Sequence, residues 1–384
     1  MKKRFVRIVA LVLSLALVFS LAACKKAEPE VSAPEATAEP TAEPTATPEP
    51  TPEPTEEPTP TPEPTPEPLP ENLSILTGLP TLTEEAIGAR PVAVMINNAR
   101  GALPQNGVGH ADILFEVPVE GDETRLMGVF SDYTKIPTVG SVRSCRYYFP
   151  IIALSFDAIY VNWGMDPTIA TQTVARLDLD QLDGIRVGFG FGRDQERLNR
   201  GVALEHTAML YGEKFPELLS RREIRTELKE EWENDAFCFA PYEEVIVPDG
   251  EAVDFIKINF GAQTSRFTYN EETHLFEKLY GKNPHIDNLT GEQIAFTNVV
   301  VLETDISVRD KTGRKNVNWQ GGPEYTGYYF TEGTKQEITW SKEDEYSKIE
   351  LFNTDGTPLV MNRGKTYIAI VYRDRVSLES DLEA

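Results

Sequence analysis

The chain has 384 residues, with 61 acidic and 37 basic side chains, a formal net charge of −24 and 40% hydrophobic residues. A chain this acidic repels the phosphate backbone, so we expect no nucleic acid among its partners. Its three cysteines and four histidines are scattered without the spacing of metal ligands. We therefore expect no metal and no cofactor.

The first 23 residues are organised like a bacterial lipoprotein signal peptide. A basic start is followed by an apolar run, residues 8–19, which is too short for an ordinary membrane span. Residues 21–24 read Leu-Ala-Ala-Cys and resemble a lipobox, where a signal peptidase cleaves and the cysteine is acylated with palmitate-type chains. We predict that Cys24 carries the lipid and tethers the protein to the extracellular face of the cell membrane. The alternative is a plain secretory signal with a chance cysteine.

Residues 24–70 combine the predicted lipidated cysteine with a linker rich in Pro, Glu and Thr. Between Lys25 and Pro70 there are 15 prolines and 11 glutamates in 46 residues. Such a composition favours an extended, disordered chain with polyproline II character. At roughly 3.1 Å per residue it could span on the order of 140 Å, enough to carry a folded module into a thick cell wall. Recognition of its "PEPT" repeats by a partner protein is the alternative.

Residues 71–235 alternate between segments typical of strands and of helices, which predicts a layered αβ domain. In the segment 111–119, Asp112 and Glu116 lie on the face opposite the apolar residues. Pro150 and Asp166-Pro167 are typical of helix starts. The expected strands are 90–97, 111–119, 124–132 and 158–164, followed by a Gly- and Arg-rich loop at 186–201 and a helix near 207–221.

Residues 236–384 read as a smaller, antiparallel β-rich domain, with short alternating strands joined by Gly, Asn and Asp turns. The fold class we predict is therefore α+β, with mixed αβ layers first and the β-rich domain second. The acidic segment 222–235 either crosses between the two domains or forms a solvated helix face. Cys145 and Cys238 are expected to be small buried thiols, and their spacing does not decide whether they pair.

Several motifs in this order resemble the YerB-like lipoprotein family, also known as domain of unknown function 3048. They are "LTGLPT" from Leu76, "RPVAVMINN" from Arg90, "LPQNGVGHADILFEVPVEGDETRL" from Leu103, "VGSVRSCRYYF" from Val139 and "GKTYIAIV" from Gly364. The resemblance implies an exported lipoprotein of Gram-positive-type bacteria and brings no established activity. The family usually has Pro-Ile-Arg-Ser-Ala-Arg at residues 141–146 and Pro-His-Asn near residues 205–207. The second departure leaves His206 without an assigned role.

The stretch "TVGSVRSCRYYF", residues 138–149, holds the candidate site. Arg143 and Arg146 stand three residues apart in a segment that looks buried, so each guanidinium needs a partner. We expect them to line an anion site with Ser144 and with further arginines from neighbouring segments, namely Arg125, Arg193, Arg197 and Arg200. The alternative is that these arginines pair with acidic residues of the segment 112–123 and serve only the fold.

We expect a non-catalytic module that binds a cell-wall component or an envelope protein. No serine has a histidine in a recognisable arrangement, and the catalytic residues stay unknown. The alternatives are a structural role in the envelope, or an envelope enzyme that acts on a phosphorylated lipid or polymer.

Overall fold

A computed structural model describes residues 68–232 and 236–381. The predicted signal peptide, Cys24 and nearly all of the predicted linker lie outside the described residues. Within those two ranges, no helix has both the length and the apolar composition needed to cross a membrane.

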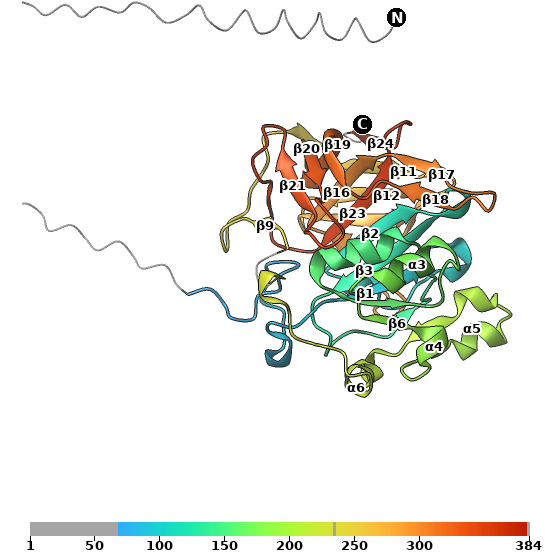
Figure 1. The fold of residues 1–384 in the computed structure, drawn as a ribbon. Helices are drawn as coiled ribbons and strands as arrows, with labels where there is room; N and C mark the ends of the chain where they lie inside the picture. Colours follow the sequence, from blue (N-terminus) through green and yellow to red (C-terminus); the bar gives the residue numbers. More distant parts are fainter. Residues whose placement is uncertain (1–67, 233–235, 382–384) are drawn as a thin grey trace, which may run out of the picture. The chain divides into compact units, whose positions relative to one another are not determined.

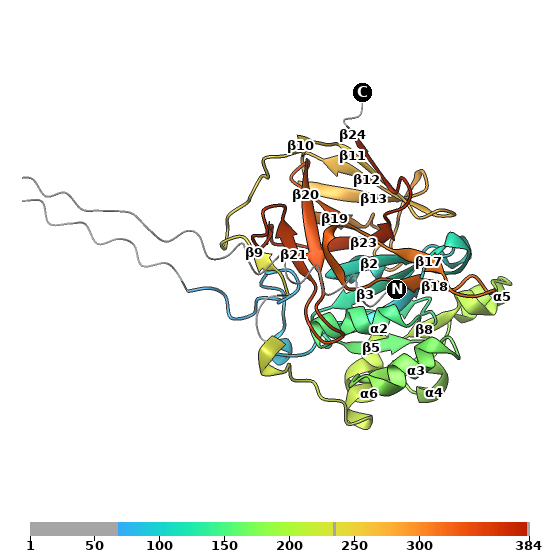
Figure 2. The same ribbon diagram turned by 45° about the horizontal axis from the view of Figure 1, so that its top comes forward.

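A mixed sheet of eleven described strands forms the centre of the fold, and both halves of the sequence contribute to it. Strand β23 lies between β16 and β2 and runs parallel to both. A strand from near the end of the chain, β23, therefore lies directly beside the early strand β2 (Figures 1 and 2). In order, with β21 (Glu350–Asn353) paired to β20, the strands are β10 (Glu251–Ala252), β20 (Thr334–Ser341), β19 (Gly321–Thr331), β16 (Asn298–Thr304), β23 (Thr366–Tyr372), β2 (Ile113–Pro118), β3 (Thr124–Phe130), β1 (Val92–Asn97), β5 (Ile159–Asn162) and β6 (Gln181–Asp183).

A second, smaller sheet of six described strands packs on one face of the large sheet. It contains β14 (Asn283–Pro284), β13 (Leu275–Tyr280), β12 (Thr264–Asn270), β11 (Phe255–Asn259) and β24 (Leu378–Asp381), with β15 (Ala295–Phe296) on β13. Three further small sheets join β17 (Ile306–Val308) to β18 (Lys315–Val317), β22 (Val360–Met361) to β9 (Cys238–Phe239), and β4 (Val139–Gly140) to β8 (Ala208–Leu210) and β7 (Phe191–Arg193).

The central strands β1, β2, β3 and β23 of the large sheet are buried on both faces, because they carry apolar residues at successive positions. In β1, Met95 belongs to the core cluster that includes Phe149 and Ile152 of α2 (Tyr148–Ala153). Its neighbour Ile96 belongs to the opposite cluster, which holds Phe267 of the second sheet. The boundary predicted near residue 235 thus separates two stretches of sequence that share one sheet and both core clusters.

The α-helices of the described residues are short. Besides α2 they are α3 (Ile169–Arg176), α4 (Gly184–Val187), α5 (Gln195–Asn199) and α6 (Phe215–Arg221). Two sequence predictions were wrong in this region. The segment predicted as one helix near 207–221 begins with β8, and only its last seven residues are α-helical, because β8 pairs with β4 and β7. The expected loop at 186–201 contains β7 and α5.

Glu116 of β2 is fully buried beneath the second sheet. Its Oε2 accepts hydrogen bonds from Ser265 Oγ and Tyr367 Oη at 2.7 Å each, and Lys278 Nζ lies 3.5 Å away. Burial lowers the pKa of Lys278, although the charge of Glu116 opposes this effect. The partner of Glu116 is therefore a lysine from the second sheet, and this charge pair lies between the two sheets.

Candidate functional site between the carboxyl ends of β1 and β5

The segment that carries Arg143 and Arg146 is hydrogen-bonded to β1 on one side and to the residue after β5 on the other. The backbone N–H of Arg143 donates to the Met95 carbonyl at 2.9 Å, and the Trp163 N–H donates to the Arg143 carbonyl at 3.0 Å. Because β1 and β5 are parallel, their carboxyl ends meet at one edge of the sheet. Ligands of open α/β sheets commonly bind in the crevice outside this edge.

A pocket of about 430 Å³ opens at this edge, and we call it the arginine pocket. Residues from α4, β7, β8, the 3-10 helix η6 (Leu204–His206) and the segments after β4 and β5 enclose it. It is lined by Val142, Arg143, Ser144, Trp163, Gly164, Met165, Ile185, Arg193, Leu204, Glu205 and Ala208.

Arg193 reaches into the arginine pocket from β7. Its guanidinium carbon lies 4.4 Å from the ring centroid of Trp163, and its Nη1 donates to the Leu204 carbonyl at 2.6 Å. Burial lowers the pKa of this guanidinium. No carboxylate of the two described ranges lies within 4.0 Å of it. Its partners are neutral groups, namely the Trp163 ring, the Leu204 carbonyl and the Thr207 hydroxyl at 3.4 Å.

Arg143 faces the same pocket and has one weak carboxylate partner. Its Nη2 lies 3.7 Å from Glu205 Oε1, and its Nη1 donates to the Glu205 carbonyl at 3.4 Å. The side chain of Glu205 is 56% exposed, and ion pairs of this kind contribute about 0–1 kcal/mol. The positive charge of Arg143 therefore remains available to a ligand.

Arg146 and Arg125 contact a different carboxylate. Arg146 Nε and Nη2 both lie 2.6 Å from Glu120 Oε1, and Arg125 Nη2 lies 3.7 Å from Glu120 Oε2. Burial alone would raise the pKa of Glu120, but the hydrogen bond and charge of Arg146 and the charge of Arg125 lower it. Burial, followed by the charge of Arg146, lowers the pKa of Arg125. Both arginines are thus partnered inside the fold.

The remaining predicted residues divide between the arginine pocket and other places. Ser144 lines it, and its carbonyl accepts a short hydrogen bond from Arg125 Nη1. Arg197 is buried elsewhere, where Nη1 donates to the Ala102 carbonyl at 2.8 Å and Nε lies 3.3 Å from Asp194. Arg200 is exposed and does not line the pocket. The structure therefore brings Arg143, Ser144 and Arg193 together in one pocket, whereas Arg125, Arg146, Arg197 and Arg200 do not line it.

Sequence reasoning missed Trp163 and Glu205, which complete this pocket. Trp163 directly follows β5, a position that could have marked it as a residue of the carboxyl edge. Next to Glu205, His206 Nδ1 lies 2.8 Å from Asn97 Nδ2, and its Nε2 lies 3.6 Å from the Glu205 carboxylate. In the described ranges, His, Cys, Asp and Glu side chains form no cluster that could hold a metal ion.

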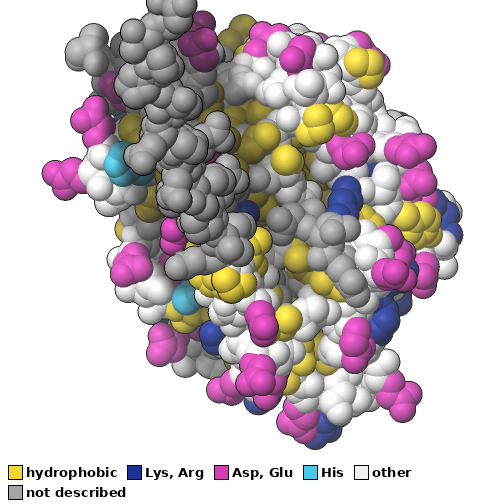
Figure 3. Space-filling model, turned by 90° about the vertical axis from the view of Figure 1, so that its left-hand side faces the viewer, with side chains coloured by type: hydrophobic (Ala, Val, Ile, Leu, Met, Phe, Trp, Pro, Cys, Tyr) yellow, Lys and Arg dark blue, Asp and Glu magenta, His cyan; other side chains and the backbone are white. Residues whose placement is uncertain are grey.

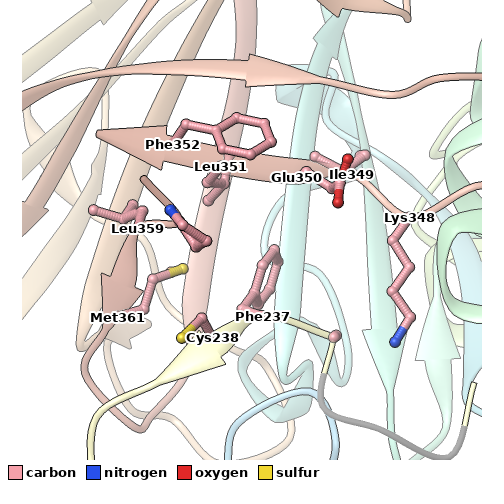
Figure 4. Close-up of a pocket in the computed structure, with 11 residues that line it drawn as sticks. Phe237, Cys238, Lys348, Ile349, Glu350, Leu351, Phe352, Leu359 and Met361 are labelled. Atoms are coloured by element: carbon pink, nitrogen blue, oxygen red, sulfur yellow. The ribbon is translucent and has the colours of Figure 1, made fainter. Parts of the chain in front are cut away.

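A second pocket has a volume of about 410 Å³. On the face that Figure 3 shows, acidic side chains are widely spread. The lining of the second pocket is mainly apolar and includes Phe237, Leu351, Leu359 and Met361 (Figure 4). Cys238 also lines it and is exposed, so the prediction of a buried thiol was wrong there, because the edge strand β9 turns this side chain outward. Cys145 is buried as predicted, and both thiols are free. This pocket gathers no cationic cluster.

The comparisons with known proteins agree with the sequence resemblance. Residues 76–225 match the family described as protein of unknown function (DUF3048), N-terminal domain, and residues 256–368 match its C-terminal domain. A Bacillus subtilis (strain 168) relative, "Putative lipoprotein YerB", is 28% identical over 302 residues, covering 77% of this chain and 85% of the relative. The crystal structure of the YerB protein from Bacillus subtilis matches with a TM-score of 0.67 and 25% identity, over 80% of this chain and 98% of that one. The chain therefore belongs to the DUF3048 family and contains both of its domains.

Proposed function

We propose that the protein is a lipid-anchored binding module of the bacterial cell envelope, whose arginine pocket takes an oxyanion carried by a wall component or an envelope protein. The observation that carries this proposal is the pair of arginines in one pocket. Arg193 has no carboxylate partner in the described part of the chain, and Arg143 has only the half-exposed Glu205 at 3.7 Å.

The membrane anchor is supported by the sequence of residues 21–24, which resembles a lipobox. The name of the Bacillus subtilis relative also describes a lipoprotein. An acyl anchor followed by the linker of residues 25–70 would hold the folded module outside the membrane, within reach of the wall.

The charges of the arginine pocket favour an anion. Two guanidinium groups and one carboxylate line it, which leaves one positive charge in excess. Guanidinium groups present several N–H donors in a fixed fork, the geometry that suits phosphate, sulfate and carboxylate oxygens. An incoming oxyanion would displace the weak contact between Arg143 and Glu205 and meet Arg193, whose positive charge lacks a counterion.

Replacing Arg143 by glutamine is expected to weaken sulfate binding by roughly 10- to 100-fold, because a hydrogen bond to a charged group contributes about 1.5–3 kcal/mol. Added sulfate should then raise the melting temperature of the wild type more than that of the variant. Without sulfate, the two proteins should differ by less than about 1 kcal/mol in unfolding free energy, since the contact with Glu205 is long, at 3.7 Å, and Glu205 is 56% exposed.

The matched control for this experiment is Arg222→Gln. Arg222 is exposed, donates only a 3.3 Å hydrogen bond to the Val187 carbonyl, and lies outside the arginine pocket. Its variant should respond to sulfate like the wild type. A severe loss of stability in Arg143→Gln, with no difference in the sulfate response, would show that this arginine serves the fold alone.

Replacing Glu205 by glutamine is expected to have the opposite effect and to tighten sulfate binding by up to about fivefold. The substitution removes the one negative charge that competes for Arg143, a contact worth about 1 kcal/mol at most. Titration calorimetry of the wild type, Glu205→Gln and the control Glu196→Gln measures this directly, since Glu196 lies on α5 outside the pocket. Weaker binding by Glu205→Gln would mean that this carboxylate helps to form the site.

A further inference from the structure

The arginine pocket is lined by apolar side chains as well as by charged ones. Six of its eleven lining residues are apolar, namely Val142, Trp163, Met165, Ile185, Leu204 and Ala208. Two of these are among the most exposed large hydrophobic side chains of the described residues, Ile185 at 64% and Leu204 at 59%. A ligand that covers them would remove apolar surface from water, which is favourable.

The apolar side chains lie next to the groups that would hold the anion. The Leu204 carbonyl accepts the hydrogen bond of Arg193 Nη1 at 2.6 Å, which fixes the backbone of Leu204 beside this cation. At Gly164, a Cβ atom would lie 2.9 Å from Ile185 Cδ1 and 3.8 Å from Ser144 Oγ. Ile185 and Ser144 therefore both lie close to Gly164.

The pocket lining has few hydrogen-bonding side chains for the part of a ligand outside its anionic group. Arg143, Ser144, Arg193 and Glu205 are the lining residues whose side chains carry strong donors or acceptors, apart from the indole N–H of Trp163. Two of the four are the proposed anion contacts. A sugar or polyol would need many hydroxyl partners, whereas an alkyl chain needs only the apolar surface that Ile185 and Leu204 supply.

We infer that the ligand of this pocket is a single amphiphile, in which an oxyanion head binds Arg143 and Arg193 and an apolar chain lies over Ile185 and Leu204. This inference rests on the proposed function and adds the chemical class of the ligand. The excess positive charge of the pocket selects against cationic and neutral amphiphiles, and the apolar rim favours an oxyanion that carries an alkyl chain over a bare inorganic anion.

The test compares two phosphates that share a head and differ in the chain. Methyl phosphate and octyl phosphate are titrated into residues 25–384, with octyl phosphate kept at concentrations where it stays monomeric. Octyl phosphate should bind at one site per chain and at least tenfold more tightly than methyl phosphate. Octyl glucoside and octyltrimethylammonium, which have the same chain without the anion, should not compete.

Variants assign the two parts of the ligand to the two parts of the pocket. Ile185→Ser with Leu204→Ser should bring the affinities of the two phosphates to within about twofold of each other, mainly by weakening the binding of octyl phosphate. Arg143→Gln should weaken both phosphates. Ile185 and Leu204 are mostly exposed, so their replacement should not unfold the protein. The same double serine substitution at Val245 and Val376, which are exposed and lie outside the pocket, is the control.

Three outcomes would overturn the inference. Equal binding of methyl and octyl phosphate by the wild type would leave the anion site intact and reject the apolar part of the ligand. A chain-length preference that survives in the double serine variant would place the chain elsewhere. If neither phosphate binds, the proposed function fails and the inference fails with it.

Discussion

Replacing Glu116 by alanine is expected to lower the free energy of unfolding by about 3–5 kcal/mol, because it leaves the ammonium of Lys278 buried without its counter-charge. Both side chains are fully buried. The substitution also removes the acceptor used by Ser265 Oγ and Tyr367 Oη, each at 2.7 Å. Urea denaturation followed by circular dichroism measures the effect, and Glu123→Ala, an exposed residue near the end of β2, is the control.

The double variant Glu116→Leu, Lys278→Met separates the loss of the ion pair from the loss of packing. If the cost comes from an unpaired buried charge, the double variant should be more stable than Lys278→Met alone. A Glu116→Ala protein within 1 kcal/mol of the wild type would show that the buried Lys278 does not need the charge of Glu116.

Replacing Cys24 by alanine is expected to abolish lipidation completely, because the lipid is attached to the thiol group of this cysteine in the predicted lipobox. Cells fed radiolabelled palmitate should label the wild-type protein and retain it in the membrane fraction. The variant should stay unlabelled, and should either keep its signal peptide or appear in the medium. Equal labelling of the two proteins would reject Cys24 as the anchor.

The sequence predicted well those strands that are marked by a pattern of apolar residues within a single segment. The segments that form β1, β2 and β3 are continuous apolar or alternating runs in the sequence. All three strands are buried in the structure, as such runs predict. Pairing between distant segments could not be predicted in this way. Strand β23 enters the large sheet beside β2, about 250 residues earlier in the chain, and no local pattern indicates which strands will be neighbours.

The candidate site shows the same limit at the level of single residues. Arg143 and Arg146 look equivalent in the sequence, three residues apart in one motif. Their partners decide their roles, and these partners are distant in sequence. Glu120 forms an ion pair with Arg146 at 2.6 Å, whereas the half-exposed Glu205 contacts Arg143 only weakly, at 3.7 Å. The sequence predicted that arginines would gather near residue 143, but only the fold shows that Arg193 joins Arg143 and that Arg197 does not.

The most direct test of the central claim is a crystal structure of the protein grown with selenate, an analogue of sulfate that is located by its anomalous scattering. We predict an anomalous peak in the arginine pocket, with selenate oxygens about 2.7–3.1 Å from the guanidinium nitrogens of Arg143 and Arg193. A map without this peak, in which Arg143 still contacts Glu205 and Arg193 still donates to the Leu204 carbonyl, would contradict the account.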